Sequence, residues 1–349
     1  MEEFLKKQAK KIDKEIEKFF PRKISSKWVK KYFEKIEFVF DWQTVDSSVV
    51  VPVWDFLARG GKRWRPALML LCCGAVGGKE IDALPFTVIP ELAHSGSLVA
   101  DDIEDNSDIR RGKPALHKLY GLDLAVNVSS LLYFLPMLRL LEKSSLREKQ
   151  KILLYEVFVA ELVKLSFGQA MDIYWHQGKK SVVSEKEYLQ MCVYKTGTLA
   201  RLAAKFGAII GGGSKTQIDA LGDFGSTIGV AFQIRDDILN LSSAKNLGKE
   251  FGEDIKEGKR ALLVIHALNN SSKAGVQRLL EILNGHTSDE SEIREAISII
   301  EKAGSFGYAK KIAANLVKGS WKKLGKKIPD SYSKKMLCEF ADFLVERGF

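Results

Sequence analysis

Apolar residues recur every three or four positions through most of this 349-residue chain, and this spacing constrains the fold more than any other feature. It places apolar side chains on one face of an α-helix, whereas the alternation typical of β-strands does not persist. The interruptions are short, and none is long enough for a disordered linker. We therefore predict an all-α fold, a single domain over residues 1–349 built as one layered bundle of roughly ten or more helices.

The first expected helix, Phe4–Phe19, has a lysine-rich polar face. Such a face would suit a membrane surface, but we expect this N-terminal extension (residues 1–40) to pack on the body of its own domain. A second helix is expected over Trp28–Val39, and the three valines at 49–51 suit either a helix or a strand. Later helices are expected over residues 124–141, 152–175, 188–210, 218–241, 261–268, 276–283, 292–303 and 308–324, with capping boxes at Ser184/Glu187 and Thr287/Glu290.

Composition limits the classes of function. The four cysteines form no metal-ligand pattern, and the sequence predicts neither a signal peptide nor a transmembrane segment, so we expect a reduced, cytoplasmic protein. The net charge of +10 is compatible with nucleic acid, anionic membrane or phosphorylated ligands. Much of the excess lies in Lys6–Lys35 and Lys310–Lys335, where solvated helix faces explain it, and no nucleic-acid partner is expected.

Two acidic clusters stand out on apolar helices. Asp101, Asp102 and Asp105 share one side of a helix end, because a helix turns by about 100° per residue. Asp236 and Asp237 repeat the pattern far down the chain. Like charges one turn apart repel, and a hard dication held by carboxylate oxygens would relieve that repulsion. The pair of clusters predicts a cleft that holds Mg²⁺ and a phosphorylated ligand.

Basic residues accompany both clusters. Lys62 and Arg65 stand at a helix start, where free N–H groups also favour an anion. Arg110-Arg111 follows the first cluster and could grip phosphate oxygens. Lys195 interrupts an apolar helix, so it needs an anionic partner, which a structural salt bridge would also supply. The loop Lys249–Lys259 could close over a polyanion.

Together these segments resemble the trans-prenyltransferases, the head-to-tail isoprenyl diphosphate synthases, and are most similar to geranylgeranyl diphosphate synthases. The likeness runs from about Gly60 to His266, and the first forty and last seventy residues carry little of it. The motifs are Gly60–Pro66, Asp101–Asp105 with Arg110-Arg111-Gly112, Gly168-Gln169 with Met171–Trp175, Lys195-Thr196-Gly197, Phe232–Asp237 and the Lys249–Lys259 loop.

The resemblance implies an isoprenoid synthase bundle with a central cleft and a Mg²⁺-assisted allylic carbocation that isopentenyl diphosphate attacks. The allylic partners would be dimethylallyl, geranyl and farnesyl diphosphate, and the usual form would be a homodimer. It implies catalytic roles for Asp101, Asp102, Asp105, Asp236 and Lys195, with the metal on Asp101, Asp105 and Asp236 and with Asp237 in support. Isopentenyl diphosphate would be held by Lys62, Arg65, His94 and Arg111, and the allylic diphosphate by Arg110, Lys195, Thr196, Gln233, Lys249 and Lys259.

Three departures from the family pattern are Asn240 for a third aspartate, Ala100 for a second histidine, and Ser166-Phe167 for a His-Arg pair. By the resemblance, the aromatic pair Tyr133-Phe134 would close the pocket floor, although plain helix packing explains it too. Gly96 and Ser97, one turn before Asp101, are too small to block a farnesyl tail, and Ser166 would leave the floor slightly deep. The main product is therefore expected to be geranylgeranyl diphosphate.

Other interpretations keep part of the pattern. A longer-chain (geranylfarnesyl or above) or farnesyl diphosphate synthase would use the same motifs. A terpene cyclase would share the aspartates and the fold but has little use for Lys62, Arg65 and Arg111. A catalytically silent subunit of a heteromeric synthase is expected to lose the aspartates or the Lys62 turn, and this chain keeps both.

Overall fold

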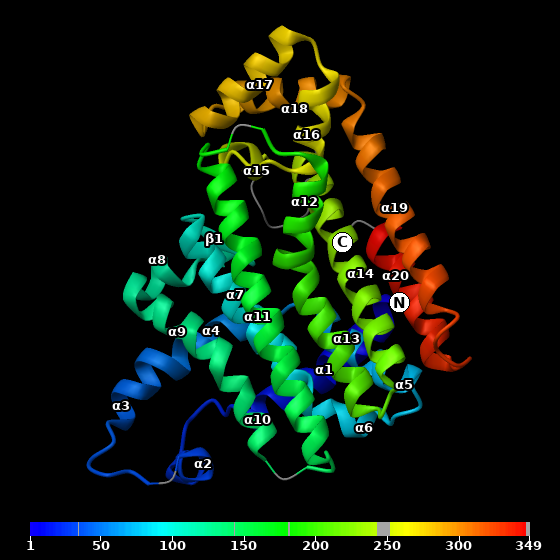
Figure 1. Cartoon of the computed structure of the whole chain (residues 1–349). Coiled ribbons are helices and arrows are strands. Elements are labelled where there is room, and N and C mark those ends of the chain that lie inside the picture. Colours follow the sequence, from blue (N-terminus) through cyan, green and yellow to red (C-terminus); the bar gives the residue numbers. More distant parts are fainter. Residues whose placement is uncertain (34, 143, 181, 243–251, 347–349) are drawn as a thin grey trace. The chain divides into compact units, whose positions relative to one another are not determined.

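A computed structural model describes residues 1–33, 35–142, 144–180, 182–242 and 252–346. Helices dominate these residues, and the strands among them form one short antiparallel pair, β1 (Ile109–Arg110) and β2 (Lys113–Pro114) (Figure 1). The all-α prediction is confirmed. The chain divides into two compact units, so the expected single domain stays a prediction. Unit 1 comprises Met1–Glu156 and Phe206–Ser214, and unit 2 comprises Val157–Lys205 and Lys215–Phe349.

Unit 1 is built around α5 (Trp64–Ala75), whose residues are almost all buried and which contacts α1 (Glu2–Phe19) and α7 (Val88–Glu104). The apolar stripe of α1, spaced at three and four residues, faces inward in this unit. The other elements of unit 1 are α2 (Ser26–Tyr32), α3 (Trp42–Val45), η1 (Asp46–Val50), α4 (Val51–Ala58), α6 (Glu80–Ala83), η2 (Leu84–Thr87), α8 (Leu116–Tyr120), α9 (Leu122–Phe134), η3 (Leu135–Met137) and α10 (Leu138–Leu141).

The helices of unit 1 differ from the sequence-based prediction in three places. The second helix ends at Tyr32, not Val39, because α2 buries Val29 but offers no continuous apolar face beyond it, and Val39 is 95% exposed. The ambiguous valines at 49–51 are helical. The helix expected over 124–141 is interrupted by η3, where Pro136 lacks the N–H that an α-helix needs.

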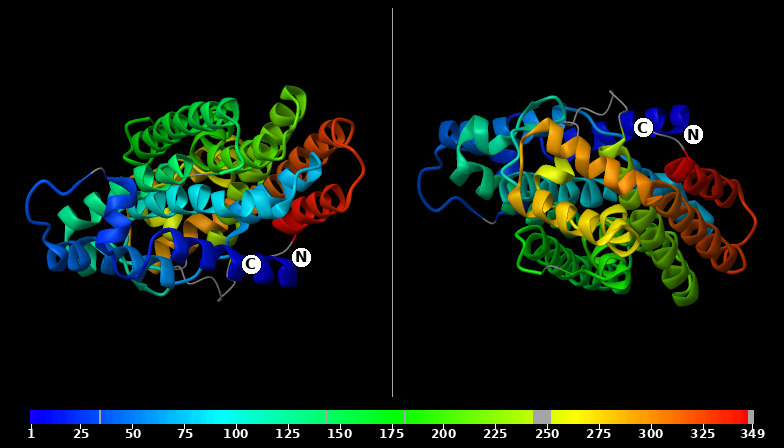
Figure 2. Two further views of the ribbon diagram at one scale, coloured as in Figure 1. Left: turned by 90° about the horizontal axis from the view of Figure 1, so that it is seen from below. Right: turned by 90° about the horizontal axis from the view of Figure 1, so that it is seen from above.

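Unit 2 is organised around α14 (Lys215–Leu241), which lies alongside α19 (Ser305–Leu324) and α20 (Tyr332–Glu346) in every view (Figure 2). A Cβ at Gly229 of α14 would lie 2.7 Å from the Cα atom of Gly197, so glycine is required for this close approach. The other elements are α12 (Glu185–Cys192), η4 (Val193–Gly197), α15 (Glu253–Lys256), α16 (Leu262–Asn270), α17 (Lys273–Gly285) and α18 (Glu290–Lys302), while α11 (Glu148–His176) and α13 (Thr198–Ile210) have residues in both units.

One of the two predicted capping boxes is correct. The Ser184 side chain accepts from the backbone N–H of Glu187, and the Glu187 carboxylate accepts from that of Ser184. The Thr287/Glu290 box is wrong, because Asp289 is the N-cap of α18 and accepts from the backbone N–H of Ser291. Aspartate caps a helix at least as well as threonine, so Asp289, which is nearer the helix, is the N-cap.

One stretch of the described residues, Leu122–Leu141, has the length and composition of a membrane span, with 39% of its most apolar window buried. The sequence analysis expected none. The stretch comprises α9, η3 and α10, and α9 packs against α7, with Val128 and Leu132 fully buried. Core helices of soluble proteins show the same composition, so length and hydropathy alone are weak evidence here.

Candidate active site

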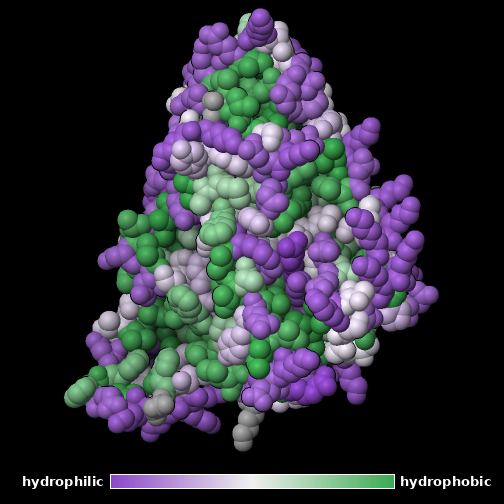
Figure 3. Space-filling view, viewed as in Figure 1, coloured by the Kyte–Doolittle hydropathy of each residue, from purple (hydrophilic) through white to green (hydrophobic). Residues whose placement is uncertain are grey.

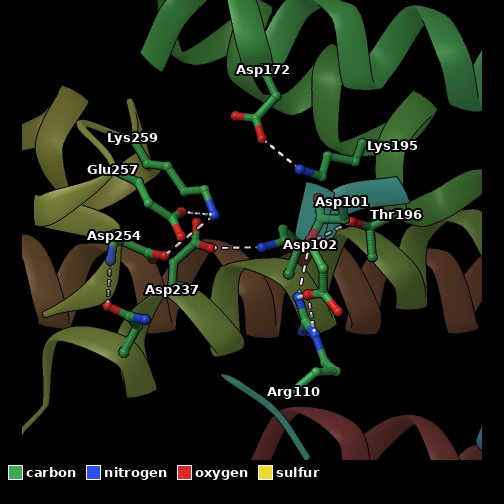
Figure 4. Close-up of polar contacts among 12 residues, drawn as sticks. Asp101, Asp102, Arg110, Asp172, Lys195, Thr196, Asp237, Asp254, Glu257 and Lys259 are labelled. Carbon is green, nitrogen blue, oxygen red and sulfur yellow. Dashed lines mark hydrogen bonds and ion pairs between the residues drawn. The ribbon is translucent and has the colours of Figure 1, made fainter. Parts of the chain in front are cut away.

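The first acidic cluster lies at the end of α7, in unit 1. Asp101 and Asp102 are on the last helical turn, and Asp105 is the residue that caps the helix C-terminus. Arg110 of β1 reaches back to this turn and donates from Nε to Asp102 Oδ1 at 2.6 Å, while its Nη2 lies 3.4 Å from Asp101 Oδ2 (Figure 4). An arginine thus supplies the positive charge that the aspartates need.

Asp102 is the buried member of this cluster and is 1% exposed. Burial raises the pKa of Asp102 to about 6, against the opposing effect of Arg110, and its Oδ2 is buried without a hydrogen-bond partner among the described residues. An orphaned carboxylate oxygen beside further carboxylates fits a hard cation. No group of three His, Cys, Asp or Glu side chains in the described part of the chain forms a ready metal site by itself.

A basic group lies elsewhere in unit 1 and consists of Arg65, His94 and Arg111. Arg65 Nη1 lies 3.0 Å from His94 Nε2, and because an arginine can only donate, this histidine nitrogen is the acceptor. Burial and the neighbouring Arg65 hold the pKa of His94 well below its usual value. Burial also lowers the pKa of Arg65 to about 10 and lowers that of Arg111. Two desolvated guanidinium groups beside a neutral imidazole favour an anion.

Arg63, between the predicted ligands Lys62 and Arg65, has a structural role that sequence reasoning missed. It is 4% exposed, donates to Glu91 of α7 at 2.6 Å and to Asp13 of α1 at 2.9 Å, and therefore joins two helices around the motif. The only sequence signal was a third basic residue in the same turn. Lys62 itself is exposed.

Unit 2 supplies the anionic partner that Lys195 was predicted to need. Lys195 Nζ donates to Asp172 Oδ2 of α11 at 2.6 Å (Figure 4). Burial alone would raise the pKa of Asp172, but Lys195 and Lys259 more than offset this and lower it. Lys195 lies in η4, a π-helical turn of the kind that often occurs at functional sites. A Cβ on Gly168 of α11 would lie 2.3 Å from the Lys195 backbone nitrogen, which explains the glycine of the Gly-Gln motif.

A hydrogen-bonded chain links the other predicted residues of unit 2. Thr196 Oγ1 donates to Gln233 Oε1 at 2.7 Å, and Gln233 Nε2 donates to Asp237 Oδ1 at 2.8 Å. The second oxygen of Asp237 accepts from Tyr188 Oη at 2.6 Å. Tyr188 is fully buried and was missed, because the sequence gives no sign that α12 packs against α14. Both Asp237 oxygens are engaged, so Asp236 on the same helix is the better candidate ligand.

Asn240, which replaces a third aspartate, anchors the segment after the second acidic cluster. Its Oδ1 accepts from the backbone N–H of Asp254 in α15 at 3.1 Å. Lys259 follows α15 and pairs with Glu257 and, at 3.8 Å, with Asp254 (Figure 4). Lys249 lies outside the described residues.

The residues predicted to set the product length lie on α7, α9 and α11. Gly96 of α7 faces α9, where a Cβ would lie 3.0 Å from both Leu132 Cβ and the Ser129 carbonyl oxygen. Tyr133 is half-buried and burial raises its pKa, whereas Phe134 is 73% exposed. The remaining two donate to their own helices, Ser97 Oγ to the His94 carbonyl at 2.8 Å and the exposed Ser166 Oγ to the Leu162 carbonyl at 3.2 Å.

The two acidic clusters belong to different units, and the cleft between them stays a prediction. Within each unit the predicted residues do gather. Unit 1 joins Arg65 to His94 and Arg110 to Asp102, and unit 2 joins Lys195 to Asp172. Paired aspartates and desolvated cations of this kind are suited to bind and stabilise an anionic ligand.

Comparison with known proteins identifies the family. The family model described as Polyprenyl synthetase matches residues 48–300, and the chain belongs to this family. The protein is thus a prenyltransferase, as the sequence analysis predicted.

Several relatives are archaeal. The short chain isoprenyl diphosphate synthase of Methanothermobacter thermautotrophicus is 39% identical over 295 residues, covering 83% of this chain and 88% of the relative. The geranylfarnesyl diphosphate synthase of Natronomonas pharaonis is 33% identical, covering 84% and 88%. The crystal structure of geranylgeranyl pyrophosphate synthetase from Pyrococcus horikoshii has a TM-score of 0.85, with 33% identity and 99% of both chains covered.

Proposed function

We propose that this protein condenses isopentenyl diphosphate with an allylic diphosphate, head to tail, and that its main product is geranylgeranyl diphosphate. The observation that carries the proposal is the separation of charge within unit 1. Arg65, His94 and Arg111 form one anion-binding group, and Asp101 and Asp102 with Arg110 form a second group of opposite character. A terpene cyclase holds one diphosphate and does not require the first group.

Isopentenyl diphosphate is assigned to Lys62, Arg65, His94 and Arg111. Because His94 is neutral, Arg65 and Arg111 provide the charge there, and their lowered pKa values express the electrostatic cost that a bound diphosphate would offset. The allylic diphosphate is assigned to Arg110, Lys195, Thr196 and Gln233 and to the two lysines of the following loop, Lys249 and Lys259.

We assign Mg²⁺ to Asp101, Asp105 and Asp236, together with oxygens of the allylic diphosphate. The Asp237 carboxylate, whose two oxygens are both engaged, supports its assignment as a supporting residue beside Asp236. When bound, the metal would supply positive charge that stabilises the departing diphosphate. Diphosphate oxygens would supply the ligands that the carboxylates of each cluster do not.

The chain's own residues would then hold the two substrates in a reactive arrangement. Lys195, kept in place by Asp172, is suited to neutralise the leaving diphosphate without donating a proton. Carbon–oxygen cleavage gives an allylic cation, the isopentenyl double bond attacks it, and the departing diphosphate is the base for the last proton. No protein nucleophile is needed.

Product length is the finer part of the proposal. Gly96 allows α9 to pack closely against α7, Ser97 is a small residue one turn before Asp101, and Tyr133 is the half-buried bulk on α9. Farnesyl and geranylfarnesyl or longer products are the alternatives, and a silent subunit of a heteromeric synthase is a more distant one. The aspartates and the basic group are both intact, which disfavours the silent subunit.

One experiment separates these possibilities. The purified protein is incubated with Mg²⁺, isopentenyl diphosphate and labelled farnesyl diphosphate, and the extracted products are sized. A twenty-carbon product supports the proposal, and a twenty-five-carbon or longer product transfers it to the longer-chain alternative. Repeating the reaction with dimethylallyl and geranyl diphosphate tests the farnesyl alternative, since a fifteen-carbon product would then accumulate. No product with any primer would leave only the silent subunit.

We also propose a homodimer in a cytoplasmic setting. Apolar side chains are exposed on α9 (Leu122 59%, Val126 48%) and, separately, on α11 (Val159 59%, Val163 49%). Apolar surface covers α9 in Figure 3. Exposed apolar residues on a helix face are typical of an interface between copies. All four cysteines are free, which suits a reducing compartment.

A further inference from the structure

The turn between β1 and β2 carries the arginines of both proposed diphosphate sites. Arg110 and Lys113 pair across the hairpin, so Arg111 and Gly112 form a two-residue loop. Their φ angles are 54° and 72°, and positive values at both positions define a type I′ turn. Glycine adopts this conformation freely, but at Arg111 it is strained. Something outside the turn must therefore stabilise it.

Arg59, the residue after α4, is in the position to do so. Its Nη1 donates to the carbonyl oxygen of Arg110 at 3.2 Å and to that of Pro114 at 2.9 Å, and thus reaches both strands of the hairpin. The Arg59 side chain is 0% exposed. The carbonyl oxygens of both strands thus share one guanidinium group as donor.

Asp55, one turn earlier on α4, orients the guanidinium group. Its Oδ2 accepts from Arg59 Nη2 at 3.0 Å and from Tyr120 Oη at 3.3 Å, and Lys113 Nζ of β2 lies 3.5 Å from Oδ1. Burial favours the neutral acid, but Arg59 and Lys113 more than offset this and lower the pKa of Asp55. Asp55 therefore stays ionised and keeps the fork of Arg59 turned toward the hairpin.

The same end of α4 also contacts the Arg111 side chain. Arg111 Nη1 donates to the carbonyl oxygen of Gly60, and its guanidinium carbon lies 5.2 Å from the centre of the Phe56 ring. Arg59 lies 5.8 Å from that ring. Backbone and side chain of the turn are thus both held by α4.

We propose that Arg59, oriented by Asp55, is a positioning residue that fixes the hairpin so that Arg110 and Arg111 meet their diphosphates. The inference rests on the proposed function. Arg59 is not among the residues assigned to either substrate. Its loss would release the strained turn and move both arginines away from the binding geometry, so it would weaken diphosphate binding more than it lowers stability.

The test compares Arg59→Met and Arg59→Lys with the control Arg139→Lys. Arg139 is a matched arginine of unit 1 that pairs with Glu142 at 2.6 Å and lies 5.6 Å from the Phe86 ring, away from the hairpin. Binding of inorganic pyrophosphate is measured by calorimetry, and the Michaelis constants for both substrates, kcat and the melting temperature are measured for every variant. Arg59→Lys keeps the positive charge but lacks the planar guanidinium group that donates to several acceptors at once. It replaces Arg59→Met in the test if that variant does not fold.

We expect Arg59→Met to weaken pyrophosphate binding and raise both Michaelis constants about tenfold, with a smaller change in kcat. Arg59→Lys should recover only part of this, and adding Asp55→Asn to it should change little because the two residues act together. Arg139→Lys should bind as the wild type does. Wild-type binding in Arg59→Lys, or equal losses in the control at equal melting temperature, overturns the inference. A wild-type protein that binds no pyrophosphate would instead overturn the proposed function.

Discussion

The two Asp-Asp pairs differ in which of their buried carboxylate oxygens have a hydrogen-bond partner. Asp102 has one oxygen bound by Arg110 and one without a partner among the described residues. Asp237, by contrast, has both oxygens occupied, by Tyr188 and Gln233. Sequence alone shows two similar Asp-Asp pairs. The structure distinguishes a pair in which one buried oxygen of Asp102 has no hydrogen-bond partner in the described part of the chain from a pair in which both oxygens of Asp237 are bonded within unit 2.

Replacing Asp101 or Asp236 by alanine is expected to abolish turnover, since each change removes a proposed metal ligand and its charge stabilisation, several kcal/mol of the barrier. The measurement is product formed per minute at saturating Mg²⁺ and substrates. Asp108→Ala is the control, because Asp108 is 81% exposed in its side chain and pairs with Lys118. Retention of more than about a hundredth of the activity in either aspartate variant would contradict the assignment.

The two aromatic residues predicted to close the pocket floor differ in exposure, so we expect them to affect product length differently. Tyr133→Ala should lengthen the product by at least one five-carbon unit, because it removes half-buried bulk beside α7. Phe134→Ala, at a residue 73% exposed, should leave the length unchanged. Chromatography of dephosphorylated products measures both. The reverse pattern would show that the exposed ring closes the pocket from another copy.

The Asp172–Lys195 pair predicts a pH dependence of stability. Asp172 has a lowered pKa when folded, so its stabilising contribution is present above the unfolded value of 3.8 and is lost as pH falls through the folded pKa. Asp172→Asn should lower the free energy of unfolding by roughly 3 kcal/mol at pH 7, because Lys195 stays half-buried without its partner. Denaturant unfolding at several pH values should show this difference shrinking below pH 3.8. A constant difference would contradict the assigned cause.

At the scale of elements, helical periodicity predicted most of the helices because packing against a core follows the same spacing. It failed where local chemistry decided the ends. The helix beginning near Trp28 stops at Tyr32 for want of apolar residues to bury, and α10 is separated from α9 by Pro136. Partners distant in sequence could not be predicted at all: nothing in the sequence connects Arg59 with the carbonyl of Pro114.

Helix α18 offers a test of the corrected cap. Asp289→Ala should lower the free energy of unfolding by about 1 kcal/mol, because the backbone N–H of Ser291 loses its acceptor. Thr287→Ala should cost less, since Thr287 Oγ1 accepts from the N–H of Asp289 outside the helix. Ser184→Ala, at the confirmed capping box of α12, is the positive control. A larger effect at Thr287 than at Asp289 would restore the original prediction.

At the scale of the whole molecule, the exposed apolar residues of α9 and α11 predict an assembly. Val126→Asp and Val163→Asp should each shift the protein from dimer to monomer in light scattering, because a charge would be buried in the interface. Ile81→Asp is the matched control, an apolar residue of α6 that is 67% exposed. A wild-type protein that is monomeric at all concentrations would contradict the proposed homodimer.

The path of the chain through its two units bears on the order in which the protein is made. Unit 1 needs Phe206–Ser214, a segment separated from the rest of that unit by the first part of unit 2. Gly207 approaches α5 so closely that a Cβ would lie 2.0 Å from the Met69 carbonyl oxygen. A ribosome must therefore release residue 214 before the N-terminal core can close. During translation the nascent chain carries an unfinished apolar surface on α5 for several seconds, which makes this interval the one most exposed to chaperone capture.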